Sequence, residues 1–183
     1  MLELRFHGRG GQGAVTSAEL IALAAIAQGN FAQAFPSFGP ERRGAPVMAF
    51  ARIDDKQIRN RTAVSNPDAV VVLDPHILHI ANSSDGLSKD GLQVVNTMRS
   101  ADEIREEYNL KGRLITVDAN HIAEQEIGRV ITNTTMLGAL IRATGVIERE
   151  LLIDELKVRF GRLAGGNIKA FNRAYEECCV EKG

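Results

Sequence analysis

The stretch of sequence that decides the fold is LELRFHGRGGQGAVTSAELIALAAIAQ, residues 2–28. Residues 2–7 have a short apolar strand pattern, residues 8–13 form a glycine loop, and residues 14–28 have an apolar helix pattern. A Gly-x-Gly-x-x-Gly match carries information only where a strand precedes it and a helix follows it. The order therefore predicts a Rossmann-like start to an α/β fold.

The chemistry of such a loop favours an anionic ligand. Glycine has no Cβ, so the backbone can adopt positive φ and approach a ligand closely. The N–H groups of the following helical turn have no partner within the helix and lie at the positive end of its dipole. A phosphate is the typical ligand of this arrangement. The same pattern also fits a turn that only packs the helix close to the sheet.

Two common nucleotide sites do not match. A dinucleotide fold places Asp or Glu about 20 residues after the loop, at the end of the second strand. Here the second apolar segment, residues 31–35, runs into Pro36 with no acid before Glu41, which argues against a nicotinamide dinucleotide. A P-loop is excluded because no Gly-Lys-Ser/Thr follows the glycines.

Bulk properties predict a single cytoplasmic domain, residues 1–183. The apolar content is 44% and the charged content 25%, as in ordinary globular proteins. No run of 18 apolar residues predicts a membrane span, and the N-terminus lacks a secretory pattern. The two cysteines, Cys178 and Cys179, are adjacent and have no metal-binding spacing. A net charge of −1 argues against nucleic acid as a partner.

The rest of the chain alternates strand and helix patterns. A β-branched run at 68–73 predicts a central parallel strand buried on both faces. The other predicted strands are 47–53, with a returning hairpin strand at 57–62, then 92–96 and 113–117; the predicted helices are 75–81, 102–108, 120–127, 135–144, 150–160 and one around 168–175. This order predicts a three-layer α/β/α domain with a mostly parallel, mixed sheet and C-terminal helices.

The segment 35–46 contains three prolines and two glycines, which exclude a helix or an interior strand. Long irregular loops in compact domains are usually functional. This one also carries Phe38, Arg42 and Arg43, residue types that are enriched at protein interfaces. We interpret it as an interface or active-site loop rather than a simple surface crossover.

No convincing catalytic or metal-binding set is present. His76 and His79 are three residues apart, but no third ligand has matching spacing, so a solvated helix face explains them better. His7 ends the first strand beside the loop and could either approach a ligand or be a buried core histidine. The sequence therefore predicts a role in binding and positioning, with no catalytic residue and no metal of its own.

Several short motifs follow one another along nearly the whole chain. They are Gly8-Arg9-Gly10-Gly11-Gln12-Gly13 with Thr16, Phe35-Pro36, Phe38-Gly39, Glu41-Arg42-Arg43-Gly44-Ala45-Pro46-Val47, Asn133-Thr134 with Leu137-Gly138-Ala139, and Asn167-Ile168-Lys169-Ala170-Phe171. In this order, the motifs resemble the γ subunit of 2-oxoacid:ferredoxin oxidoreductases. The Glu-Arg-Arg-Gly-Ala-Pro-Val form is more similar to the pyruvate and branched-chain members than to those acting on 2-oxoglutarate.

The resemblance implies an enzyme of several subunits that converts a 2-oxoacid to acyl-CoA and reduces ferredoxin. Thiamine diphosphate, Mg²⁺ and [4Fe-4S] clusters are then expected on partner subunits of the α, β and δ types. This chain would help to bind CoA and to close the active site. Residues 1–62 carry eight Lys and Arg against five Asp and Glu, a mildly basic region that suits the phosphates of CoA.

The resemblance also assigns residues to these roles. The CoA contacts would be Arg9, Gly10, Gly11, Gln12 and Gly13, with Thr16 as a supporting hydroxyl, and Phe38, Arg42 and Arg43 would face the partner subunits. Two alternatives stay open: a purely structural assembly subunit, and an independent NAD-binding oxidoreductase.

Overall fold

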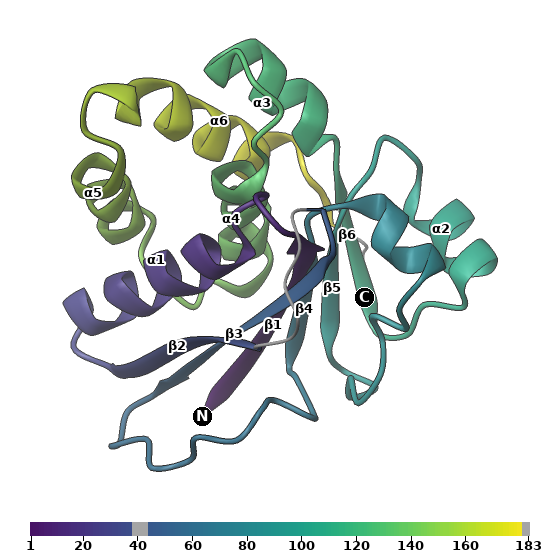
Figure 1. Ribbon diagram of the computed structural model, residues 1–183, viewed down its shortest axis with the longest axis horizontal. Helices are drawn as coiled ribbons and strands as arrows, with labels where there is room; N and C mark the ends of the chain where they lie inside the picture. Colours follow the sequence, from purple (N-terminus) through teal and green to yellow (C-terminus); the bar gives the residue numbers. More distant parts are fainter. Residues whose placement is uncertain (38–43, 181–183) are drawn as a thin grey trace.

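The computed structural model describes residues 1–37 and 44–180 and has one mixed sheet at its centre (Figure 1). The strand order is β2-β3-β1-β4-β5-β6-β7. Four strands, β1, β4, β5 and β6, are parallel, while β2, β3 and β7 are antiparallel to their neighbours. The strands are β1 (Leu2–Arg9), β2 (Phe31–Ser37), β3 (Pro46–Asp54), β4 (Ala69–Val72), β5 (Leu92–Asn96), β6 (Arg113–Val117) and β7 (Cys179–Val180).

Helices cover the two faces unequally, and the larger group lies on one side of the sheet (Figure 1). On that side, α1, α3, α4 and α6 pack with Leu4 and Phe6 of β1 into the larger core. On the other side, η1 and α2 cover Val70 and Val72 of β4. The helices are α1 (Ala14–Ala27), α2 (Ala101–Tyr108), α3 (Ala119–Ile127), α4 (Asn133–Thr144), α5 (Arg149–Phe160) and α6 (Ala164–Glu177), with 3₁₀ turns η1 (Pro75–His79) and η2 (Gly161–Leu163).

The predicted α/β fold with a mixed sheet is confirmed, and so is the buried parallel strand. All four residues of β4 are buried, and β4 lies between the parallel strands β1 and β5. The predicted glycine loop and helix lie where expected, with α1 ending at Ala27. Among the described residues, no helix has the length and apolar composition that crossing a membrane requires.

One predicted hairpin is wrong. Residues 57–62 form no strand, and β3 pairs instead with β1 and β2. The buried side chain of Arg52 explains why. Its guanidinium donates to the carbonyl oxygens of Asn60 (3.3 Å) and Thr62 (2.8 Å) and forms an ion pair with Glu3 (2.6 Å). These side-chain bonds hold the segment over the sheet without a strand ladder.

The predicted helix at 75–81 is shorter than expected. It is the 3₁₀ turn η1, with Asp74 as its N-cap and Pro75 as its first residue. The carboxylate of Asp74 accepts a hydrogen bond from the backbone N–H of His76 at 2.9 Å. The cap and the proline begin a turn that ends at His79, before the predicted end of the helix at residue 81.

Candidate ligand site at the glycine loop

The glycine loop follows β1 at the topological switch point of the sheet, where the connections after two adjacent parallel strands lie on opposite faces. The connection after β1 runs through α1 on one face, while the connection after the adjacent parallel strand β4 runs through η1 on the other. In open α/β sheets, the crevice between two such connections is the usual ligand site. Here the crevice lies between residues 8–13 and residues 73–76. The topology therefore makes this the principal candidate site.

Two glycines shape the loop. Gly13 has φ +86° and is the N-cap of α1, with no side-chain hydrogen bond to the first helical turn. A Cβ at Gly13 would lie 2.8 Å from Nδ2 of Asn133, so a larger residue would be both strained and crowded. Gly11, at φ +95°, is exposed, and no atom of the described residues lies within 4 Å of its missing Cβ. The loop is thus open at Gly11 and closely packed at Gly13.

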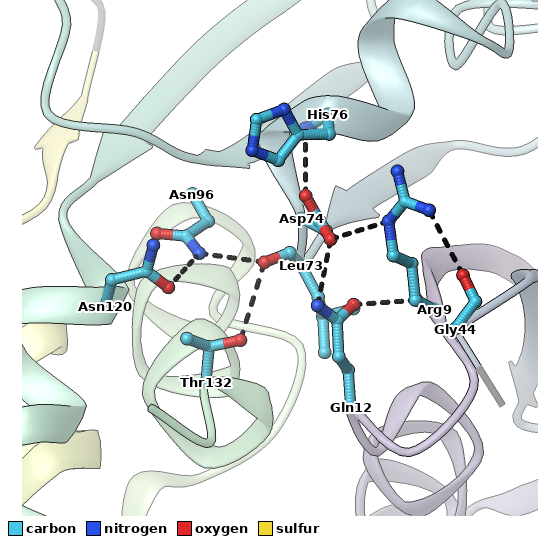
Figure 2. A network of polar contacts seen from close by, with 9 residues as sticks. All are labelled: Arg9, Gln12, Gly44, Leu73, Asp74, His76, Asn96, Asn120 and Thr132. Carbon is cyan, nitrogen blue, oxygen red and sulfur yellow. Dashed lines mark hydrogen bonds and ion pairs between the residues drawn. The ribbon is translucent and has the colours of Figure 1, made fainter. Parts of the chain in front are cut away.

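Asp74 joins the loop to the start of η1, as Figure 2 shows. One carboxylate oxygen accepts from Nε of Arg9 (3.0 Å) and from Nε2 of Gln12 (2.9 Å). The amide oxygen of Gln12 in turn accepts from the backbone N–H of Arg9 (2.7 Å). Arg9 also donates to the carbonyl oxygen of Gly44 at 3.1 Å. The loop is therefore fixed before any ligand arrives.

These contacts also set the charge of Asp74. Burial by itself raises the pKa of this carboxyl group. The hydrogen bonds from Gln12 and from the backbone of His76, together with the charge of Arg9, outweigh burial and hold the pKa below its usual value. Asp74 is ionised at neutral pH and balances much of the positive charge that Arg9 brings to the loop.

A second polar group ties the neighbouring strand ends together (Figure 2). The carbonyl oxygen of Leu73 accepts from Nδ2 of Asn96 (2.8 Å) and from the hydroxyl of Thr132 (3.5 Å). Asn96 also donates to Oδ1 of Asn120 (2.9 Å) and accepts from the backbone N–H of Ala119 (3.0 Å). The ends of β4 and β5 and the starts of α3 and α4 are thereby held in one rigid arrangement.

Two buried polar atoms beside the glycine loop lack a hydrogen-bond partner in the described part of the chain. Among the described residues, Oδ1 of Asn133, which packs against Gly13, has no hydrogen-bond partner, and neither has Nε2 of His7. Most buried polar atoms in proteins have a partner, so each exception calls for an explanation. Asn133 offers an acceptor beside the donors at the start of α1. This combination suits a ligand with both anionic and amide or hydroxyl groups.

His7 is unsuited to proton transfer. Burial, and secondarily the nearby charge of Arg5, lower the pKa of its ring to about 4. The imidazole is therefore neutral across the physiological range. Its position at the end of β1 makes it part of the wall behind the loop rather than a general acid.

A cavity of about 320 Å³ lies beside this site, above the ends of β5 and β6. It shares the segment after Asp74 with the glycine loop, because Pro75 and His76 line it. The side chain of His79 is linked there to the Tyr108 hydroxyl at 3.0 Å. Its other lining residues are Asn96, Thr97, Met98, Arg99, Asp118 and Asn120. A ligand held at the loop has room to extend in this direction.

The structure places the predicted ligand contacts in two groups. Arg9, Gly10, Gly11, Gln12 and Gly13 form the loop itself, where Arg9 and Gln12 bind Asp74. The hydroxyl of Thr16 lies one turn into α1 and accepts from Arg159 of α5 at 3.4 Å. Their contact with CoA stays a prediction. The predicted interface residues Phe38, Arg42 and Arg43 lie outside the described residues.

Sequence reasoning missed two members of the site. Asp74 is not among the predicted ligand contacts, although it follows a buried strand whose carboxyl end meets that of β1. Asn133 belongs to one of the motifs that carry the family resemblance, but it is not among the predicted ligand contacts, whereas the structure packs it against Gly13. The rule that parallel strands present their carboxyl ends on one edge could have grouped Asp74 with the loop. For Asn133, the signal is its place in the Asn133-Thr134 motif of the family resemblance.

We expect Asp74→Ala to lower the free energy of unfolding by about 2 kcal/mol, because Arg9, Gln12 and the His76 N–H lose a charged acceptor together. The pKa of Asp74 is lower in the folded state, so its contribution is full above the unfolded pKa and disappears as the pH falls through the folded pKa. Urea unfolding between pH 7 and pH 3 would measure both effects.

The exposed Asp90 provides the control, since Asp90→Ala removes a carboxylate without these partners. The wild type should lose stability more steeply than Asp74→Ala at the acid end. Equal stability of the wild type and Asp74→Ala at pH 7 would contradict the assigned role of Asp74.

Comparison with known proteins connects this geometry to a family. The model of the family described as pyruvate ferredoxin/flavodoxin oxidoreductase matches residues 3–177. The pyruvate/ketoisovalerate oxidoreductases common subunit gamma of Thermococcus kodakarensis is 49% identical over 182 residues, which is 98% of each chain.

Solved structures agree with this match. The crystal structure of pyruvate oxidoreductase subunit PORC from Thermotoga maritima is 41% identical, with a TM-score of 0.89, and the match covers 99% of this chain and 98% of that one. The gamma subunit of a keto/oxoacid ferredoxin oxidoreductase from Geobacter sulfurreducens is 26% identical, with a TM-score of 0.76, covering 96% and 97%.

Proposed function

The chain belongs to the pyruvate ferredoxin/flavodoxin oxidoreductase family, and on this premise we propose that it is the γ subunit of a multi-subunit 2-oxoacid:ferredoxin oxidoreductase. The complex would decarboxylate pyruvate or a branched-chain 2-oxoacid oxidatively, transfer the acyl group to CoA and reduce ferredoxin. The observation that carries this proposal is the match over nearly the full length of chains named as gamma subunits of pyruvate and ketoisovalerate oxidoreductases.

Within the complex, this chain would bind CoA and help to close the shared active site. Three features of the described residues support the proposal: the open backbone at Gly11, the start of α1 without a side-chain cap, and the Oδ1 atom of Asn133, which has no partner among them. The N–H groups of the loop and of the first helical turn would hold a phosphate or pantetheine oxygen of CoA. Arg9 and Gln12 would keep the loop in its binding conformation through Asp74.

The cofactors that perform the chemistry would belong to partner subunits of the α, β and δ types. Thiamine diphosphate with Mg²⁺ would supply the nucleophile for decarboxylation, and [4Fe-4S] clusters would pass electrons to ferredoxin. The described residues contain no group of three or more His, Cys, Asp and Glu side chains that could hold a metal ion. The neutral, buried His7 likewise fits binding and positioning.

The proposal is tested by assembling the complex with and without this chain. We expect pyruvate-dependent, CoA-dependent ferredoxin reduction only when this chain is present, while thiamine diphosphate and iron remain with the partner chains. Affinity capture of the tagged chain from its native cells should recover those partners, and mass spectrometry would identify them.

The rival functions give different results. Full activity of the complex in the absence of this chain would contradict a role in catalysis. An intact complex without CoA binding to this chain would favour a purely structural subunit. Saturable NADH binding to the isolated chain, with no thiamine-dependent partners in cells, would favour an independent oxidoreductase.

A further inference from the structure

The strand β2 forms one edge of the sheet and carries no charge. In the described part of the chain it has β3 as its single neighbour. Natural proteins usually protect such an edge with charged side chains, bulges or prolines, since its free backbone groups can pair with another strand. The sequence of β2 is Phe-Ala-Gln-Ala-Phe-Pro-Ser, in which Pro36 is the one protective residue. As far as residues 1–37 and 44–180 show, no other strand pairs with this edge.

The register shows which backbone groups of β2 face outward. Gly10 N–H donates to the carbonyl oxygen of Ala45 at 2.9 Å, so these two opposite residues are a hydrogen-bonded pair. Because such pairs alternate along an antiparallel ladder, the odd-numbered residues of β3 bond to β1. Even-numbered residues of β3 must then point their N–H and C=O groups toward β2, where Arg52 is opposite Gln33. It follows that Ala32 and Ala34 point theirs away from the sheet. Pro36, which has no N–H, occupies the next outward position.

The outward pattern is complementary to itself. Residues 31–35 read Phe-Ala-Gln-Ala-Phe, the same in both directions. We propose that a second copy of this chain pairs antiparallel with β2 about a two-fold axis at Gln33, joining two sheets into one. Ala32 would then lie opposite Ala34 of the second copy, and each such pair exchanges two backbone hydrogen bonds. A two-fold interface requires this kind of self-complementarity.

The side chains next to the edge suit the same arrangement. Phe31 is 49% exposed and would lie opposite Phe35 of the second copy. A cavity of about 520 Å³ at this edge is lined by Gln33, Ala34, Phe35, Pro36 and Arg61. In each copy, this cavity would receive the Phe31 ring of the other copy. Aromatic residues across an antiparallel pair add to its stability, and no like charges within β2 oppose one another.

The helix face contributes as well. Leu23 and Ile26 of α1 are 49% and 53% exposed, and α1 packs on β2 through the larger core (Figure 1). A two-fold axis perpendicular to the sheet keeps both α1 helices on the same side. The exposed apolar residues of α1 would thereby lie on the same side of the joined sheet as their counterparts in the second copy. Paired backbone and apolar side chains on both faces together make a specific interface.

The first test measures the oligomeric state of the full chain by sedimentation velocity. We expect the wild type to be a dimer and Phe31→Lys to raise its dissociation constant at least tenfold, because two charges would replace the two aromatic contacts. Val158→Lys is the matched control, since Val158 is 82% exposed on α5, and it should stay dimeric. A monomeric wild type, or an unchanged dimer in Phe31→Lys, would overturn the proposal.

The second test examines the register. Directly opposite residues that are not hydrogen-bonded have Cα atoms about 4.5 Å apart, which lies within the disulfide range of about 4.4–6.8 Å. Gln33→Cys, with both natural cysteines replaced by serine, should form a cross-linked dimer when oxidised glutathione takes up the two thiol hydrogens. Val158→Cys should not. Equal cross-linking of the two variants, each confirmed as folded by its melting curve, would refute the pairing at Gln33.

Discussion

Replacing Gly138 with alanine is expected to lower the free energy of unfolding by about 3 kcal/mol, near the upper end for overpacking a core. Gly138 lies in α4, where α4 packs against α6. A Cβ at this position would lie 2.1 Å from the carbonyl oxygen of Phe171 and 3.1 Å from the backbone nitrogen of Tyr175. Both are backbone atoms, so only a shift of a whole helix relieves the clash. The gain in helix propensity on replacing glycine, about 1 kcal/mol, is smaller.

The measurement is a melting curve with a matched glycine in the same pair of helices. Gly165 is the second residue of α6 and has no atom within 4 Å of its missing Cβ. Gly165→Ala should leave the stability unchanged or raise it slightly, while Gly138→Ala should lower the melting temperature by roughly 6–12 °C. Equal melting temperatures for wild type and Gly138→Ala would show that the helices are less closely packed than the structure has them.

Two of the motifs that carry the family resemblance meet at the α4–α6 contact. Thr134 donates its hydroxyl hydrogen to Oδ1 of Asn167 at 3.0 Å, and Asn167 donates to the carbonyl oxygen of Leu163 at 2.8 Å. These bonds and the close approach at Gly138 fix α4 against α6. Because α4 begins at Asn133, the same packing places Asn133 against Gly13. Motifs far apart in sequence therefore support one site.

Local sequence patterns predict the strand, loop and helix at the start of the chain. They do not predict which strands pair with one another in the sheet. The strand, loop and helix of residues 2–27 follow from hydrophobic period and glycine placement. The missing acid in the second strand was read as a defect in a dinucleotide site. In the structure, β2 lies at the edge of the sheet, separated from β1 by β3. The spacing rule assumes adjacent strands, so it does not apply to this topology.

The candidate site shows the same division. The glycine loop was found from its sequence, but its anchor Asp74 lies 65 residues away and reaches it only through the pairing of β1 with β4. The strand β7, two residues long, was missed because its pairing with β6 rather than a residue pattern defines it. Contacts that depend on register leave little trace in a single sequence.

Replacing Gly13 with valine should remove most of the CoA affinity of the assembled complex, by at least tenfold or about 1.4 kcal/mol. Valine is disfavoured at φ +86°, and its Cβ would lie within 3.0 Å of three atoms of Asn133. The loop can relieve this clash only by moving away from Asn133. That movement would displace the N–H groups at the start of α1, which are proposed to hold the phosphate.

Gly145→Val is the matched control, because Gly145 also has positive φ, at the end of α4, but has no atom near its missing Cβ. Both variants carry backbone strain, whereas only Gly13→Val changes the loop. Calorimetric titration of CoA into each complex, after iron and thiamine contents confirm assembly, separates the two effects. Wild-type CoA affinity in an intact Gly13→Val complex would exclude the loop as the CoA site. If Gly13→Val instead impairs assembly, while the complexes that do form bind CoA with wild-type affinity, the loop has a structural role. Backbone strain alone would not account for that result, because the Gly145→Val control carries the same kind of strain.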